Sequence, residues 1–219
     1  MWKMLLSVAL LCLFAASALG QDQTVDCVAA QGISFNNTEL FSTWYEVARN
    51  PAAASNCIEV STKLSQDNTT LSLTVAHSAT LSSNYMNVNE VASLALTNQT
   101  NGTNLVFSVN GQNQSAIFVK LLEQKKLDNG KSFLIGCGQT TPGNANTTYG
   151  FFLQNITASA TADELYSLNQ NASLKYSFFN ATSNITSVNQ SGCFRNSADR
   201  LVPAFSALMA LFYMLLKAF

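Results

Sequence analysis

The chain has 219 residues, of which 47% are hydrophobic and 11% are charged, and its formal net charge is −1. Soluble domains average about 25% charged residues, so this chain is poor in charge. The near-neutral balance argues against nucleic acid as a partner, because phosphate binding needs clustered lysine and arginine. The single histidine, His77, argues against histidine metal sites and histidine-dependent catalysis.

The N-terminus has the pattern of a secretory signal peptide. Lys3 supplies the positive start, and the apolar run 5–16 follows it. Ala18 and Gly20 are the small residues that precede a cleavage site. The alternative is a membrane anchor, but the apolar run is short. We therefore expect cleavage after Gly20 and an extracellular mature domain of ordinary single-domain size.

Between the two ends, apolar and polar residues alternate in one segment after another. A period of two predicts strands with one face in a core and the other in water. The segments with this pattern are 58–64, 71–77, 86–96, 105–109 and 117–121, and 131–138 and 148–153 are also strand-like. Turn residues separate them at 67–68, 101–102, 110–111 and 129–130, three of these pairs being Asn-Gly.

One later segment has a helical pattern. Thr161 and Glu164 form a capping box in front of Leu165 and Leu168, which share one helix face, so we expect a helix over 162–169. One short strand follows. Closure of the strands would remove exposed sheet edges. The sequence thus predicts an all-β fold, an eight-stranded antiparallel up-and-down barrel with one C-terminal α-helix and room for one small ligand.

The C-terminus is a second apolar run, 201–219, preceded by small residues at 196–198. Small residues, a short polar spacer and an apolar tail form a glycosylphosphatidylinositol (GPI) attachment signal, with Asn196 the first choice for attachment and Ser197 the second. The alternative is a single-pass helix, since the run approaches the roughly 20 residues that span a bilayer. We expect a signal peptide over 1–20, a mature domain over 21–196 and a removed propeptide over 197–219.

Asparagine is unusually frequent. The chain has 23 Asn, and 11 of them begin an Asn-x-Ser/Thr acceptor for N-glycosylation. Glycans on a secreted chain would hydrate a surface that has little charge. The acceptor residues are Asn36, Asn68, Asn98, Asn101, Asn113, Asn146, Asn155, Asn171, Asn180, Asn184 and Asn189.

Four cysteines follow the signal segment, Cys27, Cys57, Cys137 and Cys193, and four cysteines allow three pairings. The first strand is expected to open with Thr-Trp-Tyr-Glu-Val at 43–47, behind the lead-in Glu-Leu-Phe at 39–41.

This motif resembles the Gly-x-Trp-Tyr-Glu signature of lipocalins, with Ser42 in place of the glycine. Together with the cysteine order and the late helix, it resembles the apolipoprotein D and Lazarillo-like lipocalins over 27–193. Gln154 stands where that family has an arginine that packs on the tryptophan. The resemblance implies disulfides Cys27–Cys137 and Cys57–Cys193, a GPI anchor, and Trp44 as a plug at the closed end of the barrel.

If Trp44 faces inward, alternation places Glu46 inward too and predicts an apolar lining. Such a lining suits an apolar or amphipathic ligand, although the same residues would also serve as a small filled core. His77 is either a contact to a polar ligand tip or a structural residue. Lys63 and Lys120 are expected to face outward, leaving no buried charge for a carboxylate. The expected pocket residues are Ala48, Ile58, Val60, Leu73, Val75, His77, Val88, Leu94, Leu105, Phe107, Val119, Tyr149 and Phe151.

No catalytic motif, glycine-rich phosphate loop or zinc motif occurs, so we expect no enzyme, no metal and no cofactor. The favoured function is binding or transport of a small hydrophobic ligand, such as a lipid, retinoid, pheromone or tetrapyrrole, at the outer leaflet of the plasma membrane. The alternative is a GPI-anchored adhesion or signalling glycoprotein with a vestigial pocket and a cell-surface protein partner. Secretion and a single-pass topology are the alternative locations.

Overall fold

The computed structural model describes residues 26–34, 42–66, 68–96, 99–127, 129–156, 160–179 and 185–195, and the structural statements that follow concern these residues. The expected signal peptide (1–20), the attachment residues Asn196 and Ser197, and the propeptide (197–219) lie outside them. So do the glycosylation acceptors Asn36, Asn98, Asn180 and Asn184.

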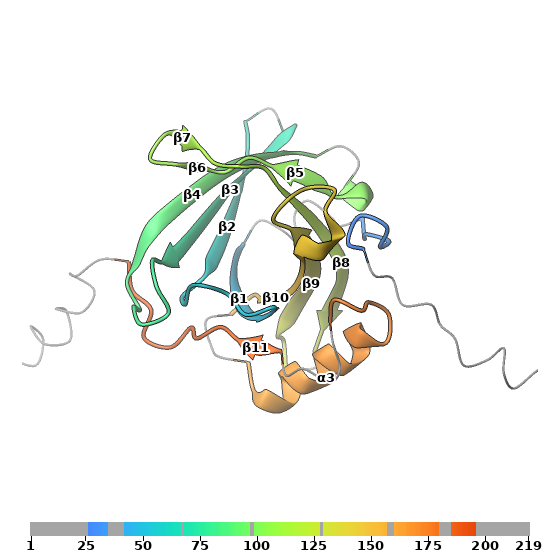
Figure 1. Ribbon diagram of the computed structural model, residues 1–219. Helices are drawn as coiled ribbons and strands as arrows, with labels where there is room; N and C mark the ends of the chain where they lie inside the picture. The colour runs from blue at the N-terminus through green and yellow to red at the C-terminus, as the bar shows by residue number, and fades with distance from the viewer. Residues whose placement is uncertain are drawn as a thin grey trace, which may run out of the picture.

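In the described part of the chain, eleven strands form one antiparallel sheet that curls round on itself, and the one α-helix there lies on its outside (Figure 1). The strands pair in the order β5-β8-β9-β10-β1-β2-β3-β4-β6-β7, and β11 pairs with β1. The strands are β1 (Thr43–Asn50), β2 (Glu59–Leu64), β3 (Thr70–Ser78), β4 (Met86–Ala95), β5 (Thr103–Leu105), β6 (Ser108–Val109), β7 (Gln112–Asn113), β8 (Ile117–Lys126), β9 (Ser132–Gln139), β10 (Thr148–Gln154) and β11 (Thr186–Ser187), and the helix is α3 (Ala162–Ser173).

The sheet has more strands than the eight predicted, because the expected strand 105–109 is interrupted and a short strand that was not expected, β7, precedes β8. Residues 106–107 separate β5 from β6, and residues 114–116 separate β7 from β8. Leu105 pairs with Ile117, whereas Ser108 pairs with Asn113, so one side of this hairpin carries an extra residue. Such a bulge breaks the ladder locally. The short β11 beside β1 adds the eleventh strand.

The predicted turn at 110–111 is present between β6 and β7. Asn110 has φ 52° and Gly111 has φ 79°, both in the left-handed region. Two consecutive residues with positive φ match the right-handed twist of the flanking strands, which is why Asn-Gly is favoured there.

The sheet buries apolar side chains on both faces. The outer faces of β1, β8, β9 and β10 pack against α3 in a core that includes Phe133, Phe152, Leu165, Leu168 and Phe179. The inner face holds two separate clusters, one with Trp44 and Leu71 and one with Leu105. The helix therefore supports the sheet from outside and leaves the interior of the curl to the strands.

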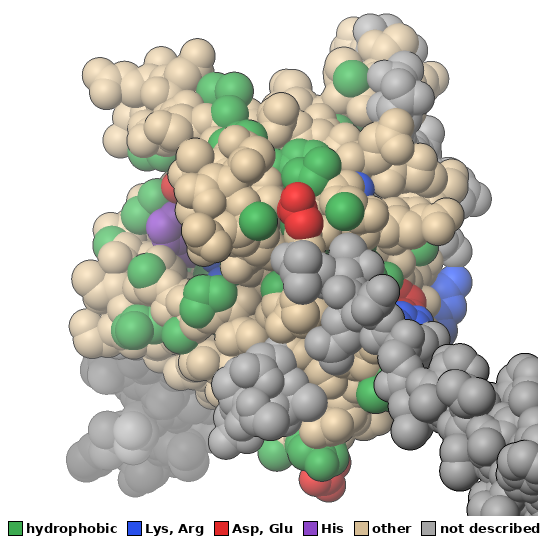
Figure 2. All heavy atoms as spheres, turned by 45° about the vertical axis from the view of Figure 1, so that its right-hand side comes forward, with side chains coloured by type: hydrophobic (Ala, Val, Ile, Leu, Met, Phe, Trp, Pro, Cys, Tyr) green, Lys and Arg blue, Asp and Glu red, His purple; other side chains and the backbone are tan. Residues whose placement is uncertain are grey.

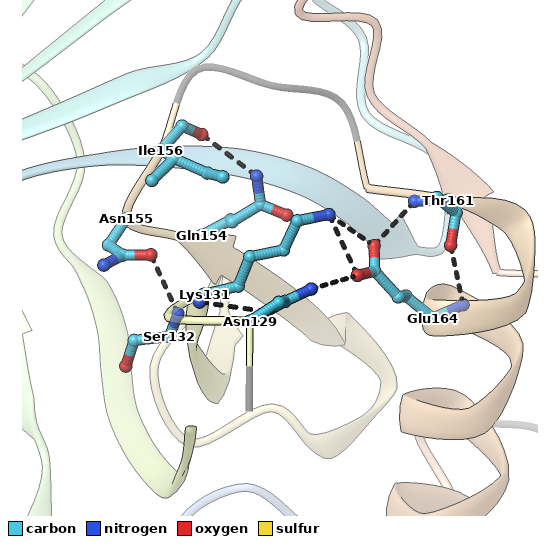
Figure 3. A network of polar contacts seen from close by, with 8 residues as sticks. All are labelled: Asn129, Lys131, Ser132, Gln154, Asn155, Ile156, Thr161 and Glu164. Atoms are coloured by element: carbon cyan, nitrogen blue, oxygen red, sulfur yellow. Dashed lines mark hydrogen bonds and ion pairs between the residues drawn. The ribbon is translucent and has the colours of Figure 1, made fainter. Parts of the chain in front are cut away.

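The capping box predicted for the helix is present and is tied to the sheet (Figure 3). Glu164 N donates to Thr161 Oγ1 at 3.2 Å, and Thr161 N donates to Glu164 Oε2 at 2.9 Å. Lys131 Nζ, from the turn between β8 and β9, lies 2.9 Å and 2.8 Å from the two Glu164 oxygens. Burial is the largest single effect and opposes the charge on Glu164. The hydrogen bonds from Lys131, Thr161 N and Asn129, together with the charge of Lys131, outweigh it and hold the pKa of Glu164 below its ordinary value.

Two disulfides attach the ends of the domain to the sheet. Cys27 is bonded to Cys137 of β9, and Cys57, in the loop between β1 and β2, is bonded to Cys193. This is the pairing that the lipocalin resemblance implied. The bonds join residues 110 and 136 positions apart, so each constrains a large part of the unfolded chain.

Candidate ligand cavity

The inner face of the curled sheet encloses a cavity of about 360 Å³. Strands β1, β2, β3, β4, β5, β8, β9 and β10 all contribute to its wall. This volume lies at the lower end of the range of small-molecule sites. Eleven of the thirteen predicted pocket residues line it: Ile58, Val60, Leu73, Val75, His77, Leu94, Leu105, Phe107, Val119, Tyr149 and Phe151.

The prediction for Ala48 was wrong, because β1 contains a β-bulge. Glu46 pairs with Leu153 and Ala48 pairs with Phe152, so Val47 is an extra residue opposite β10. The bulge reverses the alternation, and Ala48 packs in the outer core that contains the helix. Arg49 takes the inward position in its place and lines the cavity.

The prediction for Val88 was also wrong. Val88 pairs with His77 and lies on the same face of β4 as Glu90, which lines the cavity. Val88 is the residue before Glu90 on that face, nearer the beginning of β4, and it does not line the cavity. Strand alternation predicts which face a side chain occupies but not where along the strand a cavity ends.

The floor of the cavity is apolar and closed. Trp44, Leu71 and Leu134 line it and are at most 3% exposed. Above the floor, toward the mouth, the rings of Phe151 and Tyr149 lie across glycines of the neighbouring strand. A Cβ on Gly136 would lie 2.3 Å from Phe151 Cζ, and a Cβ on Gly138 would lie 2.5 Å from Tyr149 Cζ. These glycines leave the space that the two aromatic rings occupy.

The other end of the cavity is its mouth, where the chain leaves β1 and enters β2. The lining residues Ala54 and Thr140 are exposed there, and the side chains of Glu90 and Arg49 are 30% and 27% exposed. The polar and charged lining is concentrated at this end, which gives the cavity an apolar interior and a polar rim.

Glu46 and Arg49 form an ion pair in the cavity wall that the sequence analysis missed. Arg49 Nε lies 2.5 Å from Glu46 Oε1, and Arg49 Nη2 lies 2.7 Å from Glu46 Oε2. The guanidinium also lies 4.7 Å from the centre of the Tyr149 ring. Burial opposes the charge on Arg49, but the Glu46 carboxylate outweighs it, so the pKa of Arg49 lies above its ordinary value.

The sequence analysis expected Glu46 to face inward but no cation in the interior for a carboxylate. Arg49 is such a cation, although its guanidinium is already paired with Glu46. Glu46 is only 3% exposed, and its backbone carbonyl also accepts a 2.5 Å hydrogen bond from Gln190 Nε2. Residues three apart on a regular strand face opposite sides. Only the bulge at Val47 brings Glu46 and Arg49 together, and nothing in the sequence alternation marks it.

Lys120 projects to the outer side of β8, as predicted, but it is buried rather than solvated. Its Nζ donates to the carbonyl oxygens of Val28 at 2.7 Å and Ala30 at 2.8 Å. Burial lowers the pKa of Lys120, and the charge of Asp26 only partly offsets this. The ammonium is therefore committed to the N-terminal segment 26–34, although other atoms of Lys120 border the cavity.

Most of the glycosylation acceptors that the structure describes are accessible. Asn68, Asn101, Asn113, Asn146, Asn171 and Asn189 are exposed, whereas Asn155 is half-buried and its Oδ1 accepts a hydrogen bond from Ser132 N (Figure 3). Figure 2 shows that charged side chains are scattered and few on one face of the molecule. Exposed acceptors on a surface of this kind are compatible with glycans that hydrate it.

Across the described residues, no group of three or more His, Cys, Asp and Glu side chains is placed to hold a metal ion. Within the same part of the chain, no helix has the length and apolar character needed to span a bilayer. No family model matches the sequence, and no curated protein matches it.

Proposed function

We propose that this domain binds a small hydrophobic ligand in the cavity and carries or presents it outside the cell. The observation that carries the proposal is the 360 Å³ cavity with an apolar floor and walls and a polar mouth. An apolar ligand would gain roughly 25 cal/mol for each Å² of surface it buries there. No chemical step is needed for this function, so the proposal is a binding protein and not an enzyme.

The same proposal includes the lipocalin family. When β5 with β6, and β7 with β8, are each counted as one interrupted strand, the segments from β1 to β10 number eight, as in a lipocalin barrel. The Trp44 motif at the start of β1, the helix after β10 and the two disulfides support this assignment. Disulfides persist in oxidising compartments, which supports an extracellular location.

Ligand titration of the mature protein isolated from expressing eukaryotic cells tests the proposal. The neutral probe N-phenyl-1-naphthylamine gains fluorescence in an apolar cavity, and Trp44 in the floor is a second reporter. Val75→Phe fills the cavity and is expected to weaken probe binding by at least about tenfold. Ser72→Phe, on the exposed face of the same strand, is the matched control and should leave binding within about twofold.

Extraction of the purified protein followed by mass spectrometry identifies any ligand that it carries from the cell. A wild-type protein that neither binds the probe nor yields an extracted ligand contradicts the proposal and leaves the adhesion or signalling glycoprotein as the remaining alternative.

We also infer a GPI anchor at Asn196 that holds the domain on the outer leaflet of the plasma membrane. The small residues at 196–198 and the apolar tail support it. Phosphatidylinositol-specific phospholipase C should release the protein from intact cells. Retention of the protein, while an anchored control protein is released, would favour the single-pass helix.

A further inference from the structure

His77 and Glu90 lie side by side at the mouth of the cavity, on the paired strands β3 and β4. Nε2 of His77 is 3.5 Å from Oε1 of Glu90. Both side chains line the cavity and both are partly exposed, at 19% and 30%. They are therefore within reach of a molecule that enters from the mouth.

The other nitrogen of His77 defines what this pair offers to a ligand. Nδ1 lies 2.7 Å from the backbone carbonyl oxygen of Ser78. A carbonyl only accepts hydrogen bonds, so Nδ1 carries the hydrogen, and in the neutral ring Nε2 has a lone pair. Nε2 of neutral His77 and the Glu90 carboxylate are then two acceptors that face each other. A donor placed between them would satisfy both.

The other charged groups around the cavity already have hydrogen-bond partners. Both carboxylate oxygens of Glu46 are taken by Arg49, and the ammonium of Lys120 is held by two carbonyls of the N-terminal segment. Two carboxylates line the described cavity: Glu46 is paired with the permanently charged Arg49, whereas the ion-pair partner of Glu90 is His77. With His77 neutral, the mouth therefore has a net negative charge.

We propose that His77 and Glu90 form a head-group subsite for a protonated amine whose apolar body fills the cavity. This inference rests on the proposed ligand-binding function. An ammonium group brings three donors and a positive charge, so it can bind Nε2 of His77 and the Glu90 carboxylate together. A fatty-acid carboxylate brings only acceptors and a negative charge, which the same subsite repels. A long-chain alcohol, which has one donor and no charge, should bind with an affinity between those of the amine and the acid.

A displacement series with three ligands of equal chain length tests the ranking. Dodecylamine, dodecanol and dodecanoic acid compete with N-phenyl-1-naphthylamine for the mature protein at pH 7.5, below their aggregation concentrations. We expect the amine to bind at least about tenfold more tightly than the acid, since hydrogen bonds to charged groups are the stronger ones. Added salt should reduce the advantage of the amine, because the subsite is partly exposed.

Substitutions of Glu90 and His77 test whether these two residues cause the preference for the amine. Glu90→Gln should weaken amine binding by about fivefold and leave dodecanol within about twofold. His77→Phe keeps an apolar ring but removes the second acceptor, and it should weaken the amine as well. Glu59→Gln is the matched control: Glu59 lies on neighbouring β2, outside the cavity lining, where it pairs with Arg195, and its loss should not alter the ranking.

The outcomes separate the two proposals. If the acid binds as well as the amine, or Glu90→Gln leaves amine binding unchanged while the probe still binds, the head-group subsite is wrong and the ligand-binding function stands. If the wild-type protein binds neither the probe nor any of the three ligands, both the ligand-binding function and the head-group subsite are wrong.

Discussion

The mouth and the floor of the curled sheet differ in where they place their charges. The loops at the mouth, 51–58, 79–85, 110–111 and 140–147, contain no charged residue. Of the charges on the strands at this end, Arg49 and Glu90 line the cavity, whereas Glu59 pairs with Arg195 outside the lining. The floor is lined by apolar residues, and nearby charges such as Lys63 and Lys126 lie at strand ends outside the lining. The comparison supports the proposal that a ligand is recognised at the mouth, while the apolar floor closes the cavity.

The disulfides give the largest expected effect. Replacement of either pair by alanine should lower the free energy of unfolding by roughly 4–5 kcal/mol in the chain-entropy model, because both close loops of more than a hundred residues. Cys57→Ala with Cys193→Ala should also weaken probe binding, since the loop 51–58 contributes Ala53, Ala54 and Ser55 to the mouth. Denaturant unfolding and probe titration measure the two effects.

Cys27→Ala with Cys137→Ala is the comparison for that experiment. This pair joins the N-terminal segment to the outer face of β9, away from the lining. Equal losses of probe binding in the two double variants would contradict a special role for the mouth disulfide.

Trp44→Ala tests the seal at the floor. The side chain is 3% exposed and packs in the inner cluster with Leu71 and Leu134. Its removal should cost about 3–5 kcal/mol of stability, as large-to-small core substitutions of aromatic residues do. Calorimetric or denaturant unfolding gives the value. A loss below about 1 kcal/mol would mean that the floor does not depend on this ring.

Substitutions in the Glu46–Arg49 ion pair test how much this contact in the cavity wall contributes to stability. Arg49→Gln leaves the buried Glu46 carboxylate without its cation and should cost about 1–3 kcal/mol, less than a fully buried pair because Arg49 is partly exposed. The double variant Glu46→Gln with Arg49→Gln should cost less than the sum of the two single variants. Additive losses would show that the two side chains act independently.

Glu164→Gln gives the smallest expected effect, about 1 kcal/mol at pH 7, through the helix cap and Lys131. The pKa of Glu164 is lower in the folded than in the unfolded chain, so its contribution is present above the unfolded pKa and is lost as the pH falls through the folded value. The wild type and the variant should therefore converge in stability in acid. A difference that persists at pH 2 would assign the effect to packing.

Much of the fold was predictable because it depends on local patterns. Alternation located β2, β3 and β4, and Thr161 with Glu164 marked the start of the helix. The helix runs four residues beyond the expected end, to Ser173, because it packs on the sheet over a longer face than Leu165 and Leu168 define. Tertiary packing, not local propensity, sets that boundary.

The errors at the site come from features that a sequence pattern does not reveal: a bulge in the case of Ala48 and the extent of the cavity along β4 in the case of Val88. One extra residue at Val47 moved Ala48 out of the cavity and Arg49 into it. Gly136 and Gly138 in β9 have no Cβ, and only the structure shows that the rings of Phe151 and Tyr149 occupy the space a Cβ would take. Lys120 faced the expected side, but its burial depends on a segment about 90 residues earlier in the chain.

The Cys57–Cys193 bond also determines from which end the chain leaves the domain. Phe194 N donates to the carbonyl oxygen of Asn84, and the Phe194 ring stacks on Tyr85, so the last described residues are fastened beside the mouth. Only five residues separate Arg195 from the apolar run that begins at Leu201. Five residues reach at most about 18 Å when fully extended. A lipid attached at Asn196, or a membrane span formed by that run, would therefore hold the protein by its mouth end. A ligand would then have a short path between the cavity and the membrane.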